Sequence, residues 1–288
     1  MTIKVQNLTK TFDNKKVLDN ISFSVEDGET LGVAGFSGSG KSTLLKIISK
    51  LLSADSGKIE TTRNSDIAMT FQYSALFDFL DVYHNIAFPL LERREFKGKY
   101  NKEELKKIVA QKLKIVGLQG IENKFPSELS GGMQKRVGFA RAIVTNPKII
   151  LYDEPTAGLD PVSSTLIEDY INQLKKELNA SCIVVTHQMS TITRACDKVI
   201  LLYEGKIVFK GTTEEFLKGD NPYTRQFITA SIEGPMEIMR LGHLSKSIAH
   251  PNATSSTIIS KNPAITPMVP TLELSSGCAC GISSSATT

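Results

Sequence analysis

One stretch of the sequence combines glycines, a lysine and hydroxyl residues in a spacing that suits a phosphate ligand. It reads Gly35-Phe36-Ser37-Gly38-Ser39-Gly40-Lys41-Ser42-Thr43, which fits the pattern G-x-x-x-x-G-K-[S/T]. Glycines let the backbone curl so that successive N–H groups point at anionic oxygens. The positive end of a following helix adds to this attraction. Lys41 is expected to reach the β- and γ-phosphates, and the Ser42 hydroxyl to ligate Mg²⁺.

The neighbouring sequence favours this nucleotide site over a flexible Gly/Ser-rich linker. Residues 30–34 predict a short buried strand, and residues 44–48 predict the start of an amphipathic helix. A strand, a glycine loop and a helix in this order are the context that the pattern requires.

Two carboxylates follow an apolar run further along the chain. Asp153 and Glu154 come directly after the apolar residues 149–152. Ligands of doubly wound sheets bind at the carboxyl ends of strands, so we expect this pair beside the phosphate loop. There Asp153 would hold Mg²⁺ through its water shell, and Glu154 would activate the attacking water. A strand that simply ends in a polar turn is the alternative.

A second glycine-containing turn opens another predicted helix. It reads Leu129-Ser130-Gly131-Gly132-Met133-Gln134. Ser130 is a typical helix cap, and the two glycines expose backbone N–H groups. One nucleotide does not need two anion-binding helix ends, so we expect this turn to hold the γ-phosphate of a nucleotide bound by another copy. A plain helix-capping turn is the competing interpretation.

The remaining sequence indicates how these residues are positioned. Residues 1–30 alternate in short segments and predict an antiparallel β-patch. Residues 84–145 are rich in Lys and Glu with helical spacing, which predicts a helical insertion. The apolar runs 149–152 and 182–185 predict a parallel sheet covered on both faces. We expect one domain over residues 1–240 and a disordered Ser/Thr/Pro-rich tail over residues 241–288.

Composition narrows the function classes. The chain has 288 residues, 41% of them hydrophobic, and a formal net charge of +4, which does not demand nucleic acid as a partner. It contains no run of 18 apolar residues, and residues 1–5 lack the apolar core of a signal peptide. The four cysteines have neither the spacing of a disulfide framework nor that of a zinc site. We therefore expect a reduced, cytosolic, globular protein.

Six motifs together resemble the ATP-binding cassette (ABC) ATPases, the nucleotide-binding subunits of ABC transporters, over about residues 1–230. The resemblance implies an α/β fold with a P-loop NTPase (RecA-like) core, an antiparallel β-subdomain and a helical ABC-specific insertion. It also implies ATP hydrolysis, with ATP and Mg²⁺ as cofactors. The motifs stand in the order of the family: the phosphate loop, Gln72, the signature 129–134, the pair Asp153-Glu154, the loop 157–160 and His187.

The resemblance also implies roles for further residues. Gln72 would contact Mg²⁺ or the attacking water, and His187 would hydrogen-bond the γ-phosphate and position Glu154. Phe12 stands where the family has an aromatic residue that stacks on adenine. A homodimer would hold two ATP molecules between its subunits. Residues of the opposite copy would complete each site: Ser130, Gly131, Gly132, Gln134 and Asp160.

A finer resemblance concerns the segment after Gln72. Residues 71–90, with their Ala-Leu-Phe-Asp and Val-Tyr-His-Asn-Ile-Ala-Phe-Pro-Leu runs, are similar to the Mla-type ATPases of MCE-protein lipid transport systems. This implies phospholipid or related lipid transport by a peripheral subunit at the cytoplasmic face of the inner (plasma) membrane. The implied partners are an integral-membrane permease, an MCE-domain protein and, as a candidate, a STAS-domain regulator, with no nucleic acid.

Two other functions remain open. The chain shares its catalytic motifs with the ATPases of ABC importers for small polar solutes such as amino acids, and with soluble ABC proteins that have no permease. The apolar residues after Gln72 have two interpretations as well. Either they line a docking groove for a permease helix, or they pack inside the helical insertion: Leu76, Phe77, Phe79 and Leu80.

Overall fold

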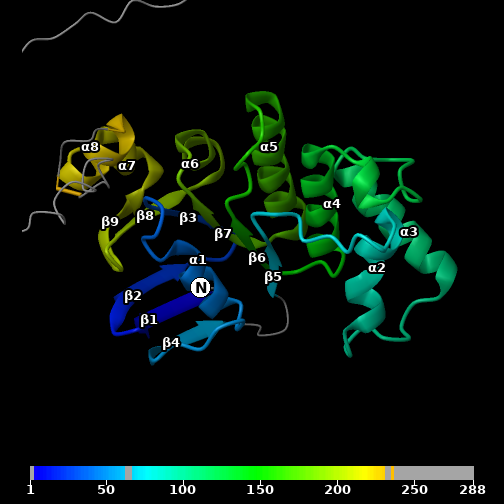
Figure 1. Ribbon diagram of the computed structural model, residues 1–288, viewed down its shortest axis with the longest axis horizontal. Helices are drawn as coiled ribbons and strands as arrows, with labels where there is room; N and C mark the ends of the chain where they lie inside the picture. The colour runs from blue at the N-terminus through cyan, green and yellow to red at the C-terminus, as the bar shows by residue number, and fades with distance from the viewer. Residues whose placement is uncertain (1–2, 62–66, 231–234, 237–288) are drawn as a thin grey trace, which may run out of the picture. The chain divides into compact units, whose positions relative to one another are not determined.

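A six-stranded sheet forms the centre of the described part of the computed structural model, which comprises residues 3–61, 67–230 and 235–236. Its strand order is β5-β6-β7-β3-β8-β9 (Figure 1). All of these strands are parallel except β9, which pairs antiparallel with β8. Their bounds are β5 Ile67–Thr70, β6 Ile149–Asp153, β7 Ser181–Thr186, β3 Thr30–Ala34, β8 Lys198–Tyr203 and β9 Lys206–Thr212.

The central strands are buried on both faces, as their apolar runs predict. Every residue of β3, β6 and β7 is buried. Along β6, Ile150 and Tyr152 belong to one hydrophobic cluster, whereas Ile149 and Leu151 belong to a second cluster. The two clusters lie on opposite faces because successive side chains of a strand point to opposite sides. The predicted parallel sheet with two covered faces is confirmed.

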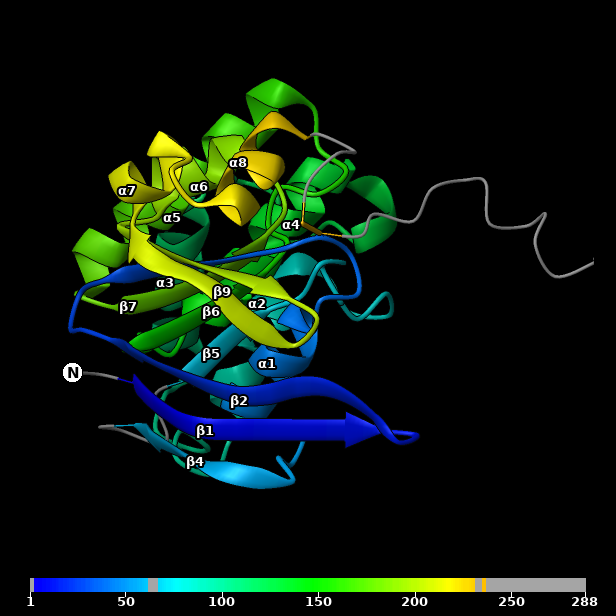
Figure 2. The same ribbon diagram turned by 90° about the vertical axis from the view of Figure 1, so that its left-hand side faces the viewer.

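A separate antiparallel sheet packs below this core. It has the order β2-β1-β4, with β1 Ile3–Phe12, β2 Lys15–Val25 and β4 Ser56–Thr61 (Figure 2). The β-patch predicted within residues 1–30 is confirmed as β1 and β2. The third strand, β4, was not predicted, because Ile59 is its single apolar residue and no alternation marks it.

Three α-helices lie between β5 and β6, α1 follows β3, and the rest come after β6. The first group is α2 Val82–Glu92, α3 Lys102–Ile115 and α4 Gly131–Ile143, with a 3₁₀ turn at Pro126–Glu128 before α4. Figure 1 shows this helical region on the right, beside the edge of the sheet at β5. The others are α1 Lys41–Ile48, α5 Pro161–Leu178, α6 Met189–Ala195, α7 Thr213–Lys218 and α8 Pro222–Thr229. No helix of the described residues is long and apolar enough to span a bilayer.

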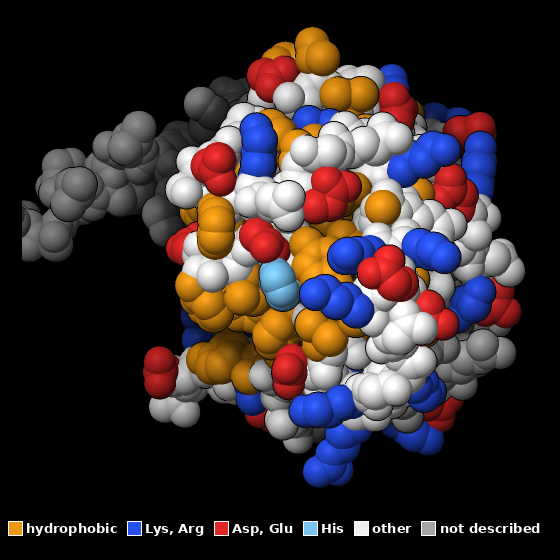
Figure 3. Space-filling view, turned by 90° about the vertical axis from the view of Figure 1, so that its right-hand side faces the viewer, with side chains coloured by type: hydrophobic (Ala, Val, Ile, Leu, Met, Phe, Trp, Pro, Cys, Tyr) orange, Lys and Arg blue, Asp and Glu red, His pale blue; other side chains and the backbone are white. Residues whose placement is uncertain are grey.

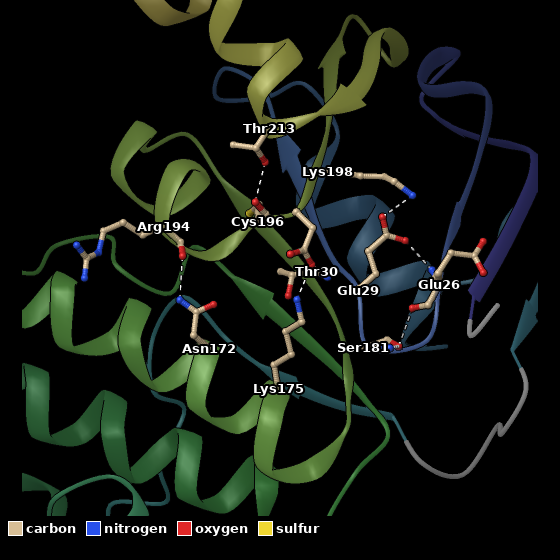
Figure 4. Close-up of polar contacts among 12 residues, drawn as sticks. Glu26, Glu29, Thr30, Asn172, Lys175, Ser181, Arg194, Cys196, Lys198 and Thr213 are labelled. Atoms are coloured by element: carbon tan, nitrogen blue, oxygen red, sulfur yellow. Dashed lines mark hydrogen bonds and ion pairs between the residues drawn. The ribbon is translucent and has the colours of Figure 1, made fainter.

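Polar contacts fasten the amino-terminal ends of the strands (Figure 4). The carboxylate of Asp197 accepts a 2.7 Å hydrogen bond from the backbone N–H of Thr30 and pairs with Lys175 of α5. Lys198 pairs with Glu29 at 2.8 Å. These contacts fix β3, β8 and α5 at the edge opposite the predicted site. The opposite, carboxyl ends of these strands, where the site is predicted, are therefore held in fixed positions.

The chain divides into two compact units. One unit is Met1–Ile238 and the other is Met239–Thr288. All the described residues belong to the first unit. The Ser/Thr/Pro-rich tail expected over residues 241–288 lies outside the described residues. Within the first unit, Cys182 and Cys196 are free and buried.

Candidate functional site

The phosphate loop joins β3 to α1, and two of its glycines, Gly35 and Gly40, occupy positions that exclude a side chain. Gly40 has φ 101°, and a Cβ atom there would lie 2.7 Å from the carbonyl oxygen of Val17. A Cβ at Gly35 would lie 2.6 Å from the carbonyl oxygen of Leu202. At Gly38 a Cβ would meet no atom within 4 Å, so this part of the loop faces open space. The loop is a backbone cradle with an accessible inner surface.

Lys41 begins α1 and turns its ammonium group back into this cradle. Its Nζ donates to the carbonyl oxygens of Gly35 (2.8 Å) and Phe36 (2.9 Å). Burial lowers the pKa of Lys41, while the carboxylates of Glu154 and Asp153 act in the opposite direction. Its hydrogen-bond partners here are neutral carbonyls, so the cation remains available to an anionic ligand.

Ser42 and Asp153 meet where β6 ends. The Ser42 hydroxyl donates to Oδ1 of Asp153 at 3.0 Å. Burial raises the pKa of Asp153, and the hydrogen bond from Ser42 opposes this shift. A hydroxyl and a carboxylate side by side are hard oxygen donors of the kind that Mg²⁺ prefers. The donor set therefore fits a magnesium ion.

Glu154 and His187 form a hydrogen-bonded pair at the ends of β6 and β7. Nδ1 of His187 lies 2.8 Å from Oε1 of Glu154, and the His187 backbone N–H approaches Oε2 at 3.4 Å. Glu154 is buried and adopts φ 48°, a left-handed conformation that is uncommon for a residue with a side chain. Such conformations cluster at functional sites. The pair provides a fixed carboxylate with an orienting imidazole.

A single cleft of about 340 Å³ is lined by these groups, apart from Gly35 and Asp153, which lie just behind lining residues. The buried Ser39 hydroxyl nearby has no hydrogen-bond partner among the described residues. The open backbone N–H groups and the ammonium group fit a triphosphate, and the pair of the Ser42 hydroxyl and the Asp153 carboxylate fits its metal ion. The lining residues are Val17, Phe36, Ser37, Gly38, Gly40, Lys41, Ser42, Thr43, Gln72, Glu154 and His187.

A second cleft, of about 290 Å³, contains other predicted site residues. Its lining includes Ser130, Gly131, Gly132 and Asp160, and none of these residues lines the first cleft. Ser130 accepts a hydrogen bond from the Met133 N–H and so caps α4. Asp160 caps α5 in the same manner. The capping interpretation thus holds within one chain, and the glycine backbone stays open to a ligand.

Five predicted site residues lie outside the lining of both clefts: Gly35, Ser39 and Asp153, which are neighbours of lining residues of the first cleft, and Phe12 and Gln134, which are not. Phe12 ends β1 with 43% of its surface exposed, and Lys10 lies over its ring. Gln134 points into the helical region. Its Nε2 donates to the carbonyl of Pro126 (2.9 Å), and its Oε1 accepts from the Ser74 hydroxyl (3.3 Å). Its geometry gives Gln134 a structural role in linking α4 to the segment after Gln72.

Lys135 was missed by the sequence analysis. From α4, its ammonium donates to the carbonyl oxygens of Ala157 and, at 3.4 Å, Pro155. These residues form the turn that follows Glu154. Burial lowers the pKa of Lys135, and the carboxylate of Glu154 opposes this shift. Lys135 therefore ties the turn after the catalytic candidate to the helix that follows the Ser-Gly-Gly turn.

Asn85 and Arg141 organise the segment after Gln72 and were also missed. The fully buried Asn85 amide donates to the carbonyl oxygens of Phe77 (3.0 Å) and Leu80 (2.9 Å), and its oxygen accepts from the Phe77 N–H. Arg141 donates to the Ser74 carbonyl at 3.0 Å and lies over the Phe77 ring. Their partners are backbone atoms and a distant ring, which leave no pattern in the sequence.

An apolar groove of about 400 Å³ adjoins this segment. Its lining includes Phe71, Phe77, Phe88, Pro89 and Arg141. Viewed from the side of the helical region, apolar side chains gather in the middle and left of the surface, with Lys and Arg on the right (Figure 3).

Three of the four apolar residues predicted after Gln72 divide between the two interpretations, and the half-buried Leu80 belongs neither to the groove lining nor to the core cluster. Phe77 lines the groove, and the ring of Phe79 lies 5.8 Å from that of Phe77 with 77% of its surface exposed. Leu76 packs against the hydrophobic core instead. The groove interpretation therefore applies to Phe77 and the packing interpretation to Leu76.

Comparison with known proteins decides the family. Residues 18–157 match the family described as "ABC transporter". The chain is 43% identical to Protein TRIGALACTOSYLDIACYLGLYCEROL 3, chloroplastic, of Arabidopsis thaliana. The alignment extends over 263 residues and covers 81% of this chain and 75% of that protein. The chain belongs to the ABC transporter family. As an ABC ATPase, it uses ATP and Mg²⁺.

Further relatives in this family differ in their named substrates. The methionine import ATP-binding protein MetN of Carboxydothermus hydrogenoformans is 38% identical, over 82% of this ABC chain and 75% of MetN. Among solved structures, a dimeric post-hydrolysis state of the ATP-binding cassette MJ0796 bound to ADP and Pi superposes with a TM-score of 0.67. It is 31% identical and covers 73% of this chain and 98% of MJ0796. These comparisons confirm the ABC ATPase fold and activity.

Proposed function

We propose that this ABC ATPase is the ATP-hydrolysing subunit of a lipid transporter of the Mla type. The observation that carries this proposal is the 43% identity to an Arabidopsis protein named after trigalactosyldiacylglycerol, a lipid. The run of residues 71–90, which is similar to the Mla-type ATPases, supports it independently. The groove beside that run is the surface through which ATP hydrolysis would act on a membrane partner.

In this proposal the first cleft binds Mg²⁺–ATP. The loop N–H groups and Lys41 hold the phosphates, and the 3.0 Å contact between Ser42 and Asp153 marks the metal site, with Gln72 on the same cleft. The bound metal ion would neutralise phosphate charge as the bond to the γ-phosphate breaks.

Glu154 is the proposed general base for the attacking water. Its carboxylate is buried and already oriented by His187 at 2.8 Å, so little reorganisation is needed before it accepts a proton. His187 itself is half exposed and would contact the γ-phosphate with its free side. Phe12 would reach the adenine from the end of β1.

Two copies would close face to face around two ATP molecules. The separation of the predicted residues into two clefts on one chain supports this arrangement, as does the dimeric structure of the similar cassette MJ0796. Ser130, Gly131 and Gly132 would offer their helix end to the triphosphate held by the other copy. Asp160, at the start of α5, would cross the interface.

The apolar groove would receive a helix of an integral-membrane permease. Aromatic rings and Pro89 offer apolar surface, and Arg141 and Glu92 offer polar contacts at the rim. The ATPase would then lie peripherally at the cytoplasmic face of the membrane. An MCE-domain protein would complete the transporter, with a STAS-domain protein as a further candidate subunit.

Purification of the tagged chain from its own membranes tests the lipid assignment. We expect a permease and an MCE-domain protein to co-purify, and the complex to move a fluorescent phospholipid between vesicles when ATP is hydrolysed. Phe88→Ser, in the groove, should lose the permease. Leu217→Ser, a similarly exposed apolar residue of α7, should retain it. A complex that hydrolyses ATP but moves no lipid contradicts the proposal.

The second candidate is the ATPase of an importer for a small polar solute. The 38% identity to a methionine import protein favours it, because that similarity covers as much of this chain as the lipid-related one. Co-purification with a solute-binding protein, together with amino-acid-stimulated ATP hydrolysis, would support the importer.

A further inference from the structure

An aromatic contact joins the phosphate loop to the helix α8, almost two hundred residues later in the chain. The rings of Phe36 and Phe227 lie 5.3 Å apart and are tilted by 57°. Phe227 is 5% exposed and contacts Phe216 of α7, which in turn contacts Phe209 of β9. The loop is thus the end of a row of four rings that crosses three elements of the C-terminal region.

A buried amide fixes α8 in this position. Nε2 of Gln226 donates to the Met236 carbonyl at 2.9 Å, and Oε1 of Gln226 accepts from the Met236 N–H at 2.7 Å. Gln226 and Met236 are 2% and 1% exposed. Losing this pair would leave buried backbone groups without partners, which is costly. Residue 236 is therefore tied to the helix that touches the phosphate loop.

The loop depends on support at Phe36. The Phe36 carbonyl accepts from Nζ of Lys41 (2.9 Å) and from the Ser39 N–H (3.2 Å). Phe36 therefore helps to set the direction of the ammonium, together with Gly35, and the curl of the loop. Gly38, by contrast, faces open space. Phe36 is also the only aromatic residue of the loop.

We propose that α8 and the segment at Met236 are part of the nucleotide site, as its support. Phe227 and Gln226 act as positioning residues: through the ring of Phe36 they hold the phosphate loop in the conformation that accepts a nucleotide. Displacement of Met236 from Gln226 would then lower nucleotide affinity without touching any reacting group. This role is independent of which substrate the transporter moves.

Nucleotide affinity of the full-length chain tests the proposal. We expect Phe227→Leu to weaken the binding of Mg²⁺–ADP, measured by calorimetry, by about three- to tenfold, because an aromatic pair contributes about that much. The rate at saturating ATP should change little. Phe209→Leu, at the far end of the same row of rings, is the matched control and should retain the wild-type affinity.

A double-mutant cycle separates positioning from general destabilisation. Phe36→Leu and Phe227→Leu remove the same ring contact, so the double variant should bind no more weakly than Phe36→Leu alone. If the two effects multiply, or if folded Phe227→Leu binds with wild-type affinity, the proposal is wrong. Should Phe227→Leu fail to fold, Gln226→Met decides in its place, since it has similar size but cannot bond Met236; unchanged affinity in that variant also overturns the proposal.

Discussion

The nucleotide cleft and the apolar groove are built in opposite ways. The cleft is lined mainly by glycines and polar residues, and all of them except Val17 of β2 lie in segments that follow the carboxyl ends of β3, β5, β6 and β7. The groove is lined mainly by apolar side chains, drawn from residues between Ile67 and Thr145. Reactive groups are fixed by short backbone motifs on a rigid sheet, whereas the partner surface depends on how distant segments pack.

Helix α4 connects the two regions. Near its start Lys135 binds the turn after Glu154, and two turns later Arg141 holds Ser74 and lines the groove. A shift of α4 would move both contacts together. Because the two linings share no residue, the comparison predicts that variants in the cleft stop ATP hydrolysis, while variants around the groove that leave α4 in place keep hydrolysis and impair partner binding.

Lys41→Ala should have the largest effect. The variant loses the ammonium that lies in the phosphate cradle, so it should bind Mg²⁺–ATP weakly and hydrolyse it at least about 10²- to 10³-fold more slowly. Phosphate release from the purified chain is the measurement. Lys50→Ala, an exposed lysine just beyond α1, is the control and should behave as wild type. Turnover at the wild-type rate in Lys41→Ala would show that ATP is not hydrolysed in this cleft.

Glu154→Gln should separate binding from chemistry in the same cleft. The amide keeps the shape but cannot accept the proton, so hydrolysis should fall by about 10²- to 10⁴-fold while ATP binding persists. We expect the variant to accumulate as a closed dimer with ATP, seen by light scattering with and without nucleotide. Turnover at the wild-type rate would show that another group is the base.

The sequence was informative for the cleft because its parts are local. The loop from Gly35 to Thr43 has its own pattern, and the Asp153-Glu154 pair directly follows a buried strand. Their meeting at one edge follows from the parallel sheet. The antiparallel β1–β2 pair was predictable from alternation, but β4 was not, since it has one apolar residue and gains its place by pairing with β1.

The groove was only partly predictable for a physical reason. Apolar residues after Gln72 indicated some exposed surface, but which of them faced outward depended on long-range contacts. The buried amide of Asn85 turns the chain at Phe77, and the guanidinium of Arg141 covers one face of that ring. The amide of Gln134 likewise bonds the Pro126 carbonyl and the Ser74 hydroxyl, partners that the sequence does not reveal, while its predicted contact with a nucleotide stays a prediction.

Asn85→Leu should distort the groove and spare the cleft. The leucine is of similar size but leaves the partly buried Phe77 N–H without its acceptor, which should lower the free energy of unfolding by about 1–3 kcal/mol. Urea unfolding measures this loss. The folded variant should retain its basal ATP hydrolysis and lose co-purification with the permease. Asn172→Leu, which removes a single bond to the Arg194 carbonyl, is the control and should keep the permease.

Asn101→Ala should have the smallest effect on stability, and it tests whether the helical region is coupled to the nucleotide cleft. Asn101 caps α3 by accepting from the Glu104 N–H, and the Glu104 carboxylate accepts from the Asn101 N–H. Losing this cap should cost about 1 kcal/mol of stability in urea unfolding, and Asn101→Ser should restore most of it. Neither variant touches the cleft, so nucleotide affinity should not change. A change in nucleotide affinity for the folded Asn101→Ala protein would mean that α3 and the cleft move as one unit. That result would contradict the expectation that the helical region and the cleft act independently.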